Sequence, residues 1–565
     1  MKRRLLPILM TLVLVCALPI WAAFVTSGDV TNPLVCTAWA DTAEGERNSG
    51  TTQETFTEVT DETTLKKAVA DGKSVRMTQD ITLTSSLCIE KAVTLDMDGH
   101  VLTRMHTYEY DMVVIRSDAT LTLIDSNTGN LQHRFNAGET GWTKAADNAT
   151  GDGIVTVTGG VIYGDAGRSI INPCGIKILK GKLEMYGGSI VGIRNVYNAN
   201  GGGVYVSDQC TFNMYGGSIK GCYVFSDGGG VYVAAGGTFT MSGSSAITNC
   251  KGSRGGAVYN AGTFTMRDNS HIADCIYNSS IASGGGVHNK GTFTVEGGSI
   301  TGSVNDYNRE QSSDDICNEN KLDVSEGITI SCNVNVGYGG TISKGTFTGR
   351  VWIFWEGTIL GGTFTNEVIN YEGTIKAGEF TGEVTNTSGG TISGGTFDKN
   401  VANESGATIS GGTFNENVTN KTNATLNGGI FYGGVTNDGG KIEDGAYETV
   451  KFNSDNGAQA KEEKVLRGQK VAKPTDDPTK SGYTFIGWED ADGAYDFSKP
   501  VIAQLALKAK WEKKPSSGYY YYPTTDTKAD DTKGSPKTAD PGVALYAALS
   551  ILSLTGMVAL NGKKR

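Results

Sequence analysis

Short alternations of apolar and polar residues recur along the chain, most clearly between residues 183 and 303. Successive units begin at Gly202, Gly229, Gly256 and Gly285, and each holds 25 to 29 residues with three strand-like pieces separated by glycine. Strands this short are not stable as isolated hairpins, but they can pair with their equivalents one unit later if the chain winds into a coil. The pattern therefore predicts a β-solenoid whose equivalent strands lie about 4.8 Å apart.

Equivalent positions of successive units carry the same kind of side chain, so we expect ladders of stacked side chains. A tyrosine ladder, a phenylalanine ladder and a cysteine column are formed by Tyr205, Tyr232 and Tyr259, by Phe212, Phe239, Phe264 and Phe293, and by Cys222, Cys250 and Cys275. A cysteine column can be a reactive site, but buried cysteine more often packs as a small apolar side chain. We interpret the column as part of the core.

The repeated Gly-Gly-Val-Tyr-Val and Thr-Phe-Thr-Met phrases resemble the right-handed parallel β-helix of the pectin-lyase-like superfamily. The resemblance implies an all-β fold, which we place at residues 60–336. Residues 64–70 have helical spacing and end at Asp71 and Gly72, so they predict a short helix that covers the open end of the first coil. Residues 125–150 break the pattern and are expected to loop out of the solenoid.

A second, shorter repeat occupies residues 337–449 and predicts a second, narrow β-solenoid. Its units begin at Thr341, Thr358, Thr374, Thr391, Thr408, Thr425 and Lys441, which gives a period of 16 to 17 residues and seven coils. An aromatic column is predicted from Phe347, Phe364, Phe380, Phe397, Phe414, Phe431 and Tyr447, beside a valine column at Val351, Val368, Val384, Val401, Val418 and Val435. An asparagine column, expected to chain side-chain amides along the axis, is predicted from Asn370, Asn386, Asn403, Asn420 and Asn437. The handedness of this segment does not follow from the sequence.

The regular recurrence of glycine ends at Val450. Residues 450–512 show longer alternating patterns typical of strands and contain two tryptophans. The string Gly482-Tyr483-Thr484-Phe485-Ile486-Gly487-Trp488 and the closing Lys508-Ala509-Lys510-Trp511 are similar to the Listeria–Bacteroides repeat of internalin-type surface proteins. That resemblance implies a small β-grasp-like module and a location on the cell surface. It does not identify a ligand.

The N-terminus predicts export. Basic residues at positions 2–4 precede an apolar run over 5–25, which is typical of a signal peptide. We assign the signal peptide to residues 1–40 and expect a disordered lead-in at 41–59. The cleavage site stays open between Ala22 or Ala23 and Ala40, and an uncleaved membrane anchor is the alternative.

The C-terminus predicts attachment. Residues 513–534 form a polar, tyrosine-rich spacer, and an apolar run at 543–560 is long enough to span a bilayer ahead of a basic tail. The motif before it, Ser535-Pro536-Lys537-Thr538-Ala539, resembles a Gram-positive sortase signal, which implies cleavage after Thr538 and transfer to peptidoglycan. Ser535 stands where leucine is usual and Ala539 where glycine is usual, so the sortase stays open. A plain C-terminal membrane anchor within residues 535–565 is the alternative.

Composition favours many short strands joined by tight turns and disfavours one class of partner. The 565 residues include 78 glycines and 11 prolines and carry a net charge of −11, which disfavours a nucleic-acid partner. None of the 10 cysteines forms a CxxC pair, so the sequence predicts no metal and no cofactor; the disulfide state stays open.

Candidate catalytic groups are few. Carboxylate pairs occur at Asp96 and Asp98 and at Asp314 and Asp315, but each pair reads more readily as a turn than as acid–base machinery. We therefore expect an adhesin or structural display rod that binds an extracellular glycan or protein, and no enzyme. The rival is a polysaccharide-cleaving lyase or hydrolase, which would gain if three or more acidic and basic side chains converged in a groove of the first solenoid.

Overall fold

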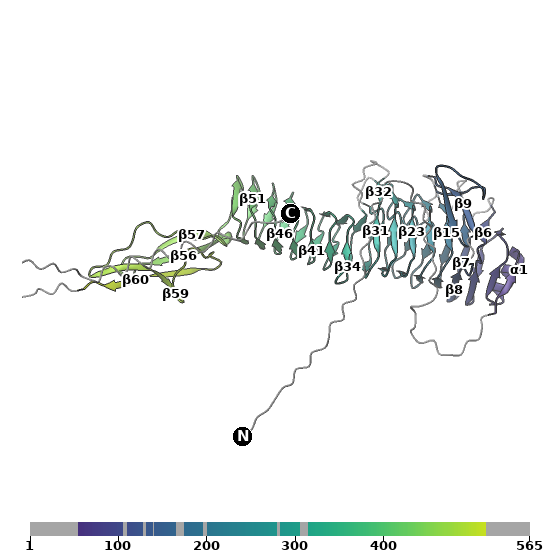
Figure 1. The fold of residues 1–565 in the computed structure, drawn as a ribbon, viewed down its shortest axis with the longest axis horizontal. Coiled ribbons are helices and arrows are strands. Elements are labelled where there is room, and N and C mark those ends of the chain that lie inside the picture. The colour runs from purple at the N-terminus through teal and green to yellow at the C-terminus, as the bar shows by residue number, and fades with distance from the viewer. Residues whose placement is uncertain are drawn as a thin grey trace, which may run out of the picture.

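The computed structural model describes residues 55–105, 110–127, 131–138, 141–164, 174–195, 200–279, 283–305 and 315–515. These residues form a long rod of parallel β-coils followed by a small C-terminal sheet (Figure 1). The predicted all-β solenoid is confirmed.

Two long parallel sheets run the length of the rod. Sheet 1 has 17 strands, from β1 (Thr57–Val59) to β55 (Lys441–Ile442). Sheet 2 has 15 strands, which are β4 (Leu87–Ile89), β7 (Val113–Ile115), β13 (Ile176–Ile178), β17 (Val204–Val206), β21 (Val231–Val233), β25 (Val258–Asn260), β29 (Val287–Asn289), β33 (Ile316–Asn318), β36 (Val334–Val336), β39 (Val351–Ile353), β42 (Val368–Tyr371), β45 (Val384–Thr387), β48 (Val401–Asn403), β51 (Val418–Lys421) and β54 (Val435–Asp438). Neither sheet is interrupted between the wide and the narrow coils, so both repeats belong to one rod.

The third side of the rod changes where the coils become shorter. Sheet 3 covers the wide coils with eight strands, from β3 (Ile81–Leu83) to β31 (Ser299–Thr301). Sheet 4 covers the narrow coils with β35 (Thr329–Ile330), β38 (Thr346–Phe347), β41 (Thr363–Phe364), β44 (Glu379–Phe380), β47 (Thr396–Phe397), β50 (Thr413–Phe414) and β53 (Ile430–Phe431). The first short coil runs from Ile316 to its pairing partner Val334 in the next strand of sheet 2. The short coils therefore begin one coil before the predicted boundary at residue 336.

Wide coils contain one strand more than the three that the sequence predicts. Short strands from β16 (Arg194–Asn195) to β32 (Val304–Asn305) form a five-stranded sheet at the corner after sheet 3. One continuous hydrophobic core then runs inside both types of coil, from Val59 to Ala446. This shared core positions the outward side chains of sheet 2 in regular rows.

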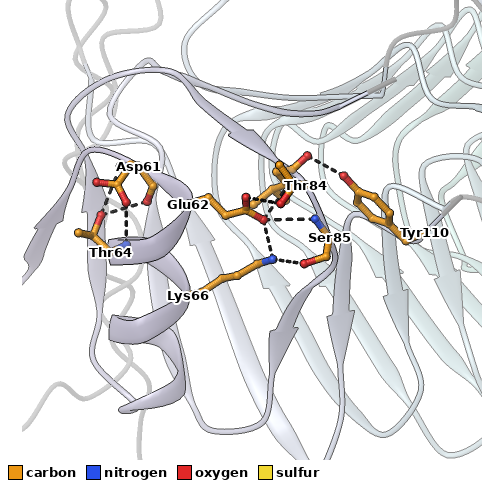
Figure 2. Close-up of polar contacts among 8 residues, drawn as sticks. Asp61, Glu62, Thr64, Lys66, Thr84, Ser85 and Tyr110 are labelled. Atoms are coloured by element: carbon orange, nitrogen blue, oxygen red, sulfur yellow. Dashed lines mark hydrogen bonds and ion pairs between the residues drawn. The ribbon is translucent and has the colours of Figure 1, made fainter. Parts of the chain in front are cut away.

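The N-terminal end of the core is closed by α1 (Glu62–Ala70), as predicted. Its buried face presents Leu65, Ala68 and Val69 to the first coil. Figure 2 shows how polar contacts hold this helix: Glu62 accepts hydrogen bonds from the backbone nitrogen of Thr84 at 2.8 Å and from Nζ of Lys66 at 2.6 Å. Burial raises the pKa of Glu62, but these donors outweigh it and lower the pKa to about 2.

Residues 131–138 and 141–158 do not simply loop out, which corrects the expectation for 125–150. They form an antiparallel sheet of β9 (Gln132–Asn136), β10 (Thr143–Lys144) and β11 (Ile154–Thr158). Phe135, Trp142 and Val157 make a small core of their own against the wide coils. Apolar and polar residues do not alternate regularly over residues 131–158, so the sequence did not predict these strands.

The C-terminal module closes the other end of the solenoid. Its strands are β56 (Tyr447–Asn453), β57 (Lys461–Leu466), β58 (Tyr483–Asp490), β59 (Gly493–Ala494) and β60 (Leu505–Lys513), in the order β57-β56-β60-β58-β59. The turn after β57 lies on the last coil, where the backbone nitrogen of Phe431 donates to the carbonyl oxygen of Arg467 at 2.8 Å. Both ends of the core are therefore covered by protein.

Candidate binding face

An aromatic ladder projects from sheet 2 on the side away from the core. Strand alternation turns valines inward at positions such as Val204 and Val206 and turns the residue between them outward. Tyr205, Tyr232 and Tyr259 occupy equivalent outward positions, as predicted, and the next strand places His288 in the same row.

The rings of this ladder stack face to face. Centroid separations are 5.1 Å for Tyr205–Tyr232, 5.1 Å for Tyr232–Tyr259 and 5.2 Å for Tyr259–His288, with interplanar angles of 14°, 2° and 9°. Because each ring covers its neighbour, the ladder presents ring edges and hydroxyl groups outward rather than ring faces. Burial raises the pKa of Tyr259 to about 12, so this hydroxyl stays protonated at physiological pH.

Charged side chains flank the ladder in pairs. Arg254 binds Asp227 through two hydrogen bonds of 2.9 and 2.6 Å and lies over the Tyr259 ring. Lys290 contacts Glu319 at 2.9 Å. Burial would raise the pKa of Glu319, but its contacts with His288 and Lys290 hold the pKa below its ordinary value.

A cavity of about 470 Å³ opens beside these pairs. Its lining is mixed in charge and consists of Arg254, Ser279, Ser283, His288, Lys290, Glu319 and Tyr338. Two cations, one carboxylate and an imidazole thus converge in the wide solenoid, and a convergence of acidic and basic side chains favours the enzyme alternative. The sequence contained a partial signal, since His288 replaces tyrosine in a recurring phrase.

Three residues at this end of the ladder could hold a metal ion. Ligand atoms of His288, Cys317 and Glu319 all lie within 4.8 Å of one another. Sequence reasoning missed this cluster because it looked for closely spaced cysteines, whereas these residues meet through coil stacking.

The predicted carboxylate pairs have structural partners. Asp96 is fully buried and accepts hydrogen bonds from Nε of Arg76 at 2.8 Å and from the backbone nitrogen of Ser126 at 2.9 Å. Asp98 adopts a positive φ of 42°, typical of a tight turn. Asp315 accepts from the backbone nitrogen atoms of Ser303 and Asn333, and Asp314 lies outside the described residues. The described members of both pairs therefore hold turns in place.

The aromatic column of the narrow coils forms as predicted up to Phe431. Neighbouring rings stack at 4.7–5.2 Å along Phe347, Phe364, Phe380, Phe397, Phe414 and Phe431, all buried. Tyr447 is a correction: it begins β56 and pairs with Leu466 in the C-terminal module. Its side chain is partly buried against the end of the solenoid core, but its strand belongs to the C-terminal sheet and not to sheet 4, which ends at β53.

The predicted asparagine column is present and longer than expected. Nδ2 of each residue donates to Oδ1 of the next at 2.7–2.9 Å through Asn370, Asn386, Asn403, Asn420 and Asn437. A second group of Asn260, Asn289 and Asn318 repeats this bonding at 2.7 Å in the wide coils. The two groups occupy one row, separated by Val336 and Ile353.

The cysteine column is buried as predicted. Cys222, Cys250 and Cys275 each have no measurable exposure, and burial raises the pKa of Cys222 and of Cys250 well above the ordinary value. None of the eight cysteines in the described ranges forms a disulfide.

Both predicted targeting segments lie outside the described residues, including Ser535–Ala539 and the apolar run 543–560. Within the part that the structure describes, no helix has the length and apolar character needed to cross a membrane.

Comparison with known proteins assigns one segment. Residues 449–510 match the model of the Listeria-Bacteroides repeat domain, which covers the C-terminal module. Such domains are typical of extracellular surface proteins. Searches of curated proteins and of solved structures give no match.

Proposed function

We propose that the protein is an exported bacterial surface protein whose solenoid serves as a display rod and adhesin. The observation that carries the proposal is the junction at Phe431, where a Listeria-Bacteroides repeat module caps a continuous β-solenoid. This arrangement sets the wide coils at the other end of the rod from the C-terminal module (Figure 1). If the chain is attached through its C-terminus, a binding face on the wide coils lies beyond both the module and the narrow coils and is accessible to partners outside the cell.

The wide coils provide the binding face. Tyrosine hydroxyls spaced about one strand apart, with Arg254 and Lys290 beside them, offer regularly repeated donors to an extended partner. An extracellular glycan or an acidic protein segment fits this surface. The narrow coils then act mainly as a spacer, because their rows are occupied by internal stacking and amide bonding.

The attachment follows from the C-terminal sequence. A sortase would cleave between Thr538 and Ala539 and link Thr538 to peptidoglycan; a membrane helix at 543–560 would give the same exposure without that link. In a Gram-positive expression host, antibody against residues 55–515 should label intact cells, and a muramidase should release the protein. Deletion of residues 535–565 should send it into the medium. Protein that stays inside intact cells contradicts the proposal.

Ligand binding is tested separately. The full chain should bind a subset of an extracellular glycan and matrix-protein array, and Tyr232→Ala should weaken that binding. Thr385→Ala, at an equivalent row of the narrow coils, serves as the control. An array on which both variants bind as the parent does would exclude the aromatic ladder as the binding face.

A second candidate, polysaccharide cleavage, is favoured by the cavity around Glu319. A lyase needs a basic side chain beside an acidic sugar, and Arg254 and Lys290 line this cavity with their positive charge. Incubation of the full chain with pectin, alginate and mucin glycans, with Lys290→Ala as the comparison, tests it by product release. Products formed by the parent and lost in the variant would establish an enzyme.

A further inference from the structure

The solenoid brings three metal-ligating side chains together at the end of the aromatic ladder. His288 in β29 and Cys317 in β33 are direct partners across the parallel sheet. Glu319 follows Cys317 by two residues, so alternation places both on the same outward side. The ligand atoms of all three lie within 4.8 Å of one another.

The imidazole of His288 lacks the partners that a buried polar group requires. Its side chain is 1% exposed, and neither ring nitrogen has a well-aligned hydrogen bond among the described residues. Nε2 lies 3.2 Å from Oε1 of Glu319, but the contact does not meet hydrogen-bond geometry. Leaving such a buried polar group unsatisfied is destabilising. A cation that accepts the lone pair of one ring nitrogen would satisfy that nitrogen.

The surrounding charges fit a cation. Nζ of Lys290 lies 2.9 Å from Oε2 of Glu319, which leaves Oε1 on the side of His288. Such a contact resembles the outer partners that orient metal-binding carboxylates. The other nearby cation, Arg254, is engaged by Asp227 at 2.6 Å. Arg254 is therefore paired with a carboxylate outside the cluster, whereas Lys290 would share Glu319 with a cation bound in the cluster, through the other carboxylate oxygen.

We propose that His288, Cys317 and Glu319 bind a divalent transition-metal ion of the zinc type. A thiolate and a carboxylate balance the charge of the ion, and the imidazole completes a set that favours zinc over calcium or magnesium. Binding releases the thiol proton of Cys317 to solvent. Bonds of about 2.0–2.3 Å require ligand atoms less than about 4 Å apart, so the side chains draw together when the ion binds.

The site keeps one side open. Three protein ligands leave a fourth tetrahedral position, and His288 and Glu319 line the 470 Å³ cavity. A water molecule or an oxygen of an extracellular ligand can occupy that position. The metal ion would then lie between the last ring of the aromatic ladder, His288, and the cavity.

Cobalt(II) titration of the reduced full chain tests the proposal, because cobalt(II) reports thiolate coordination by a charge-transfer band. We expect one equivalent to bind with this band, and zinc to abolish it while excess calcium or magnesium does not. His288→Phe keeps a ring on Tyr259 but removes the nitrogen, and Cys317→Ser removes the thiolate. Each should weaken binding by more than about 100-fold, since even outer-shell changes cost 10–100-fold.

Cys88→Ser is the matched control, because Cys88 occupies the same outward row of sheet 2 in β4. It should retain the band and the affinity of the parent. Circular dichroism of all variants separates loss of a ligand from loss of the fold. A band that survives Cys317→Ser, or a folded parent that binds no more cobalt than folded Cys317→Ser does, would overturn the proposal.

Discussion

Nδ2 of Asn370 donates to Oδ1 of Asn386 at 2.7 Å, whereas Oδ1 of Asn370 has no hydrogen-bond partner among the described residues. The reason is the preceding coil, which carries Ile353 at the equivalent position and offers no amide. Every later member both accepts and donates, so the column has a direction. Its unsatisfied group lies at one end, and its interior members are fully bonded.

Loss of an interior asparagine should cost more than loss of the last one. Asn403 donates to Oδ1 of Asn420 and to the carbonyl oxygen of Thr425, and it accepts from Asn386. We expect Asn403→Ala to destabilise the narrow coils by about 2–4 kcal/mol, because several buried groups lose partners together. Hydrogen exchange of the flanking strands measures this change.

Asn437→Ala is the control for that substitution. Asn437 is exposed and ends the column: its Oδ1 accepts from Asn420, and its Nδ2 donates to the carbonyl oxygen of Gly440 in an exposed contact that water can replace. We expect a cost below about 1 kcal/mol. Equal exchange rates in the two variants would mean that the amide column contributes little to stability.

Removal of one phenylalanine should open a cavity within the aromatic column. Phe397 is fully buried and stacks at 4.7 Å on Phe380 and at 4.8 Å on Phe414. Phe397→Ala should cost about 3–5 kcal/mol. Tyr432→Ala, at an exposed side chain, should leave stability nearly unchanged. Because coils interact mainly with their neighbours, exchange should rise locally around Phe397 rather than throughout the rod.

The ladders could be predicted because their positions recur in the sequence at the coil length. Phe397 and Asn403 were identified in this way, and the pairing registers confirm them. Tyr447 was misplaced, because its spacing continues the repeat while its strand pairs with Leu466. Repeat spacing identifies equivalent positions in successive coils. It does not show where the coils end and the strands of the next domain begin to pair with one another.

The candidate metal cluster could be predicted only in part. His288 occupies the position that tyrosine takes in the other copies of the Gly-Gly-Val-Tyr phrase. The sequence alone therefore predicted that His288 belongs to the row of the tyrosine ladder. Cys317 stands in a phrase where Asp314 and Asp315 replace the glycine pair at Gly285 and Gly286, so its equivalence with His288 emerges only from the strand register. The cavity is lined in part by residues between strands, such as Ser279 and Ser283. These connecting segments do not repeat from coil to coil, so the sequence did not predict the cavity.

Acid should weaken the N-terminal cap. The pKa of Glu62 is lowered from 4.5 to about 2, so the folded state favours the charged carboxylate. Its contribution is therefore complete above about pH 4.5 and is lost as the pH falls towards 2. Glu62→Gln should reduce cap stability at neutral pH by about 1–3 kcal/mol and flatten this acid dependence. Hydrogen exchange of α1 between pH 3 and 7 measures it, with Glu90→Gln as an exposed control.

Docking of the C-terminal module should depend on Gly468, which approaches the last coil closely. Gly468 has a positive φ of 93°, and a Cβ atom there would lie 2.7 Å from the backbone nitrogen of Phe431. Gly457 has a similar φ of 90° but has open space around it. Gly457→Ala therefore measures the backbone strain alone, about 1–2 kcal/mol. Gly468→Ala adds the steric clash, so only this variant should expose the Phe431 amide, which donates to Arg467, to rapid hydrogen exchange. Equal protection of that amide in both variants would show that the module does not cap the solenoid through this contact.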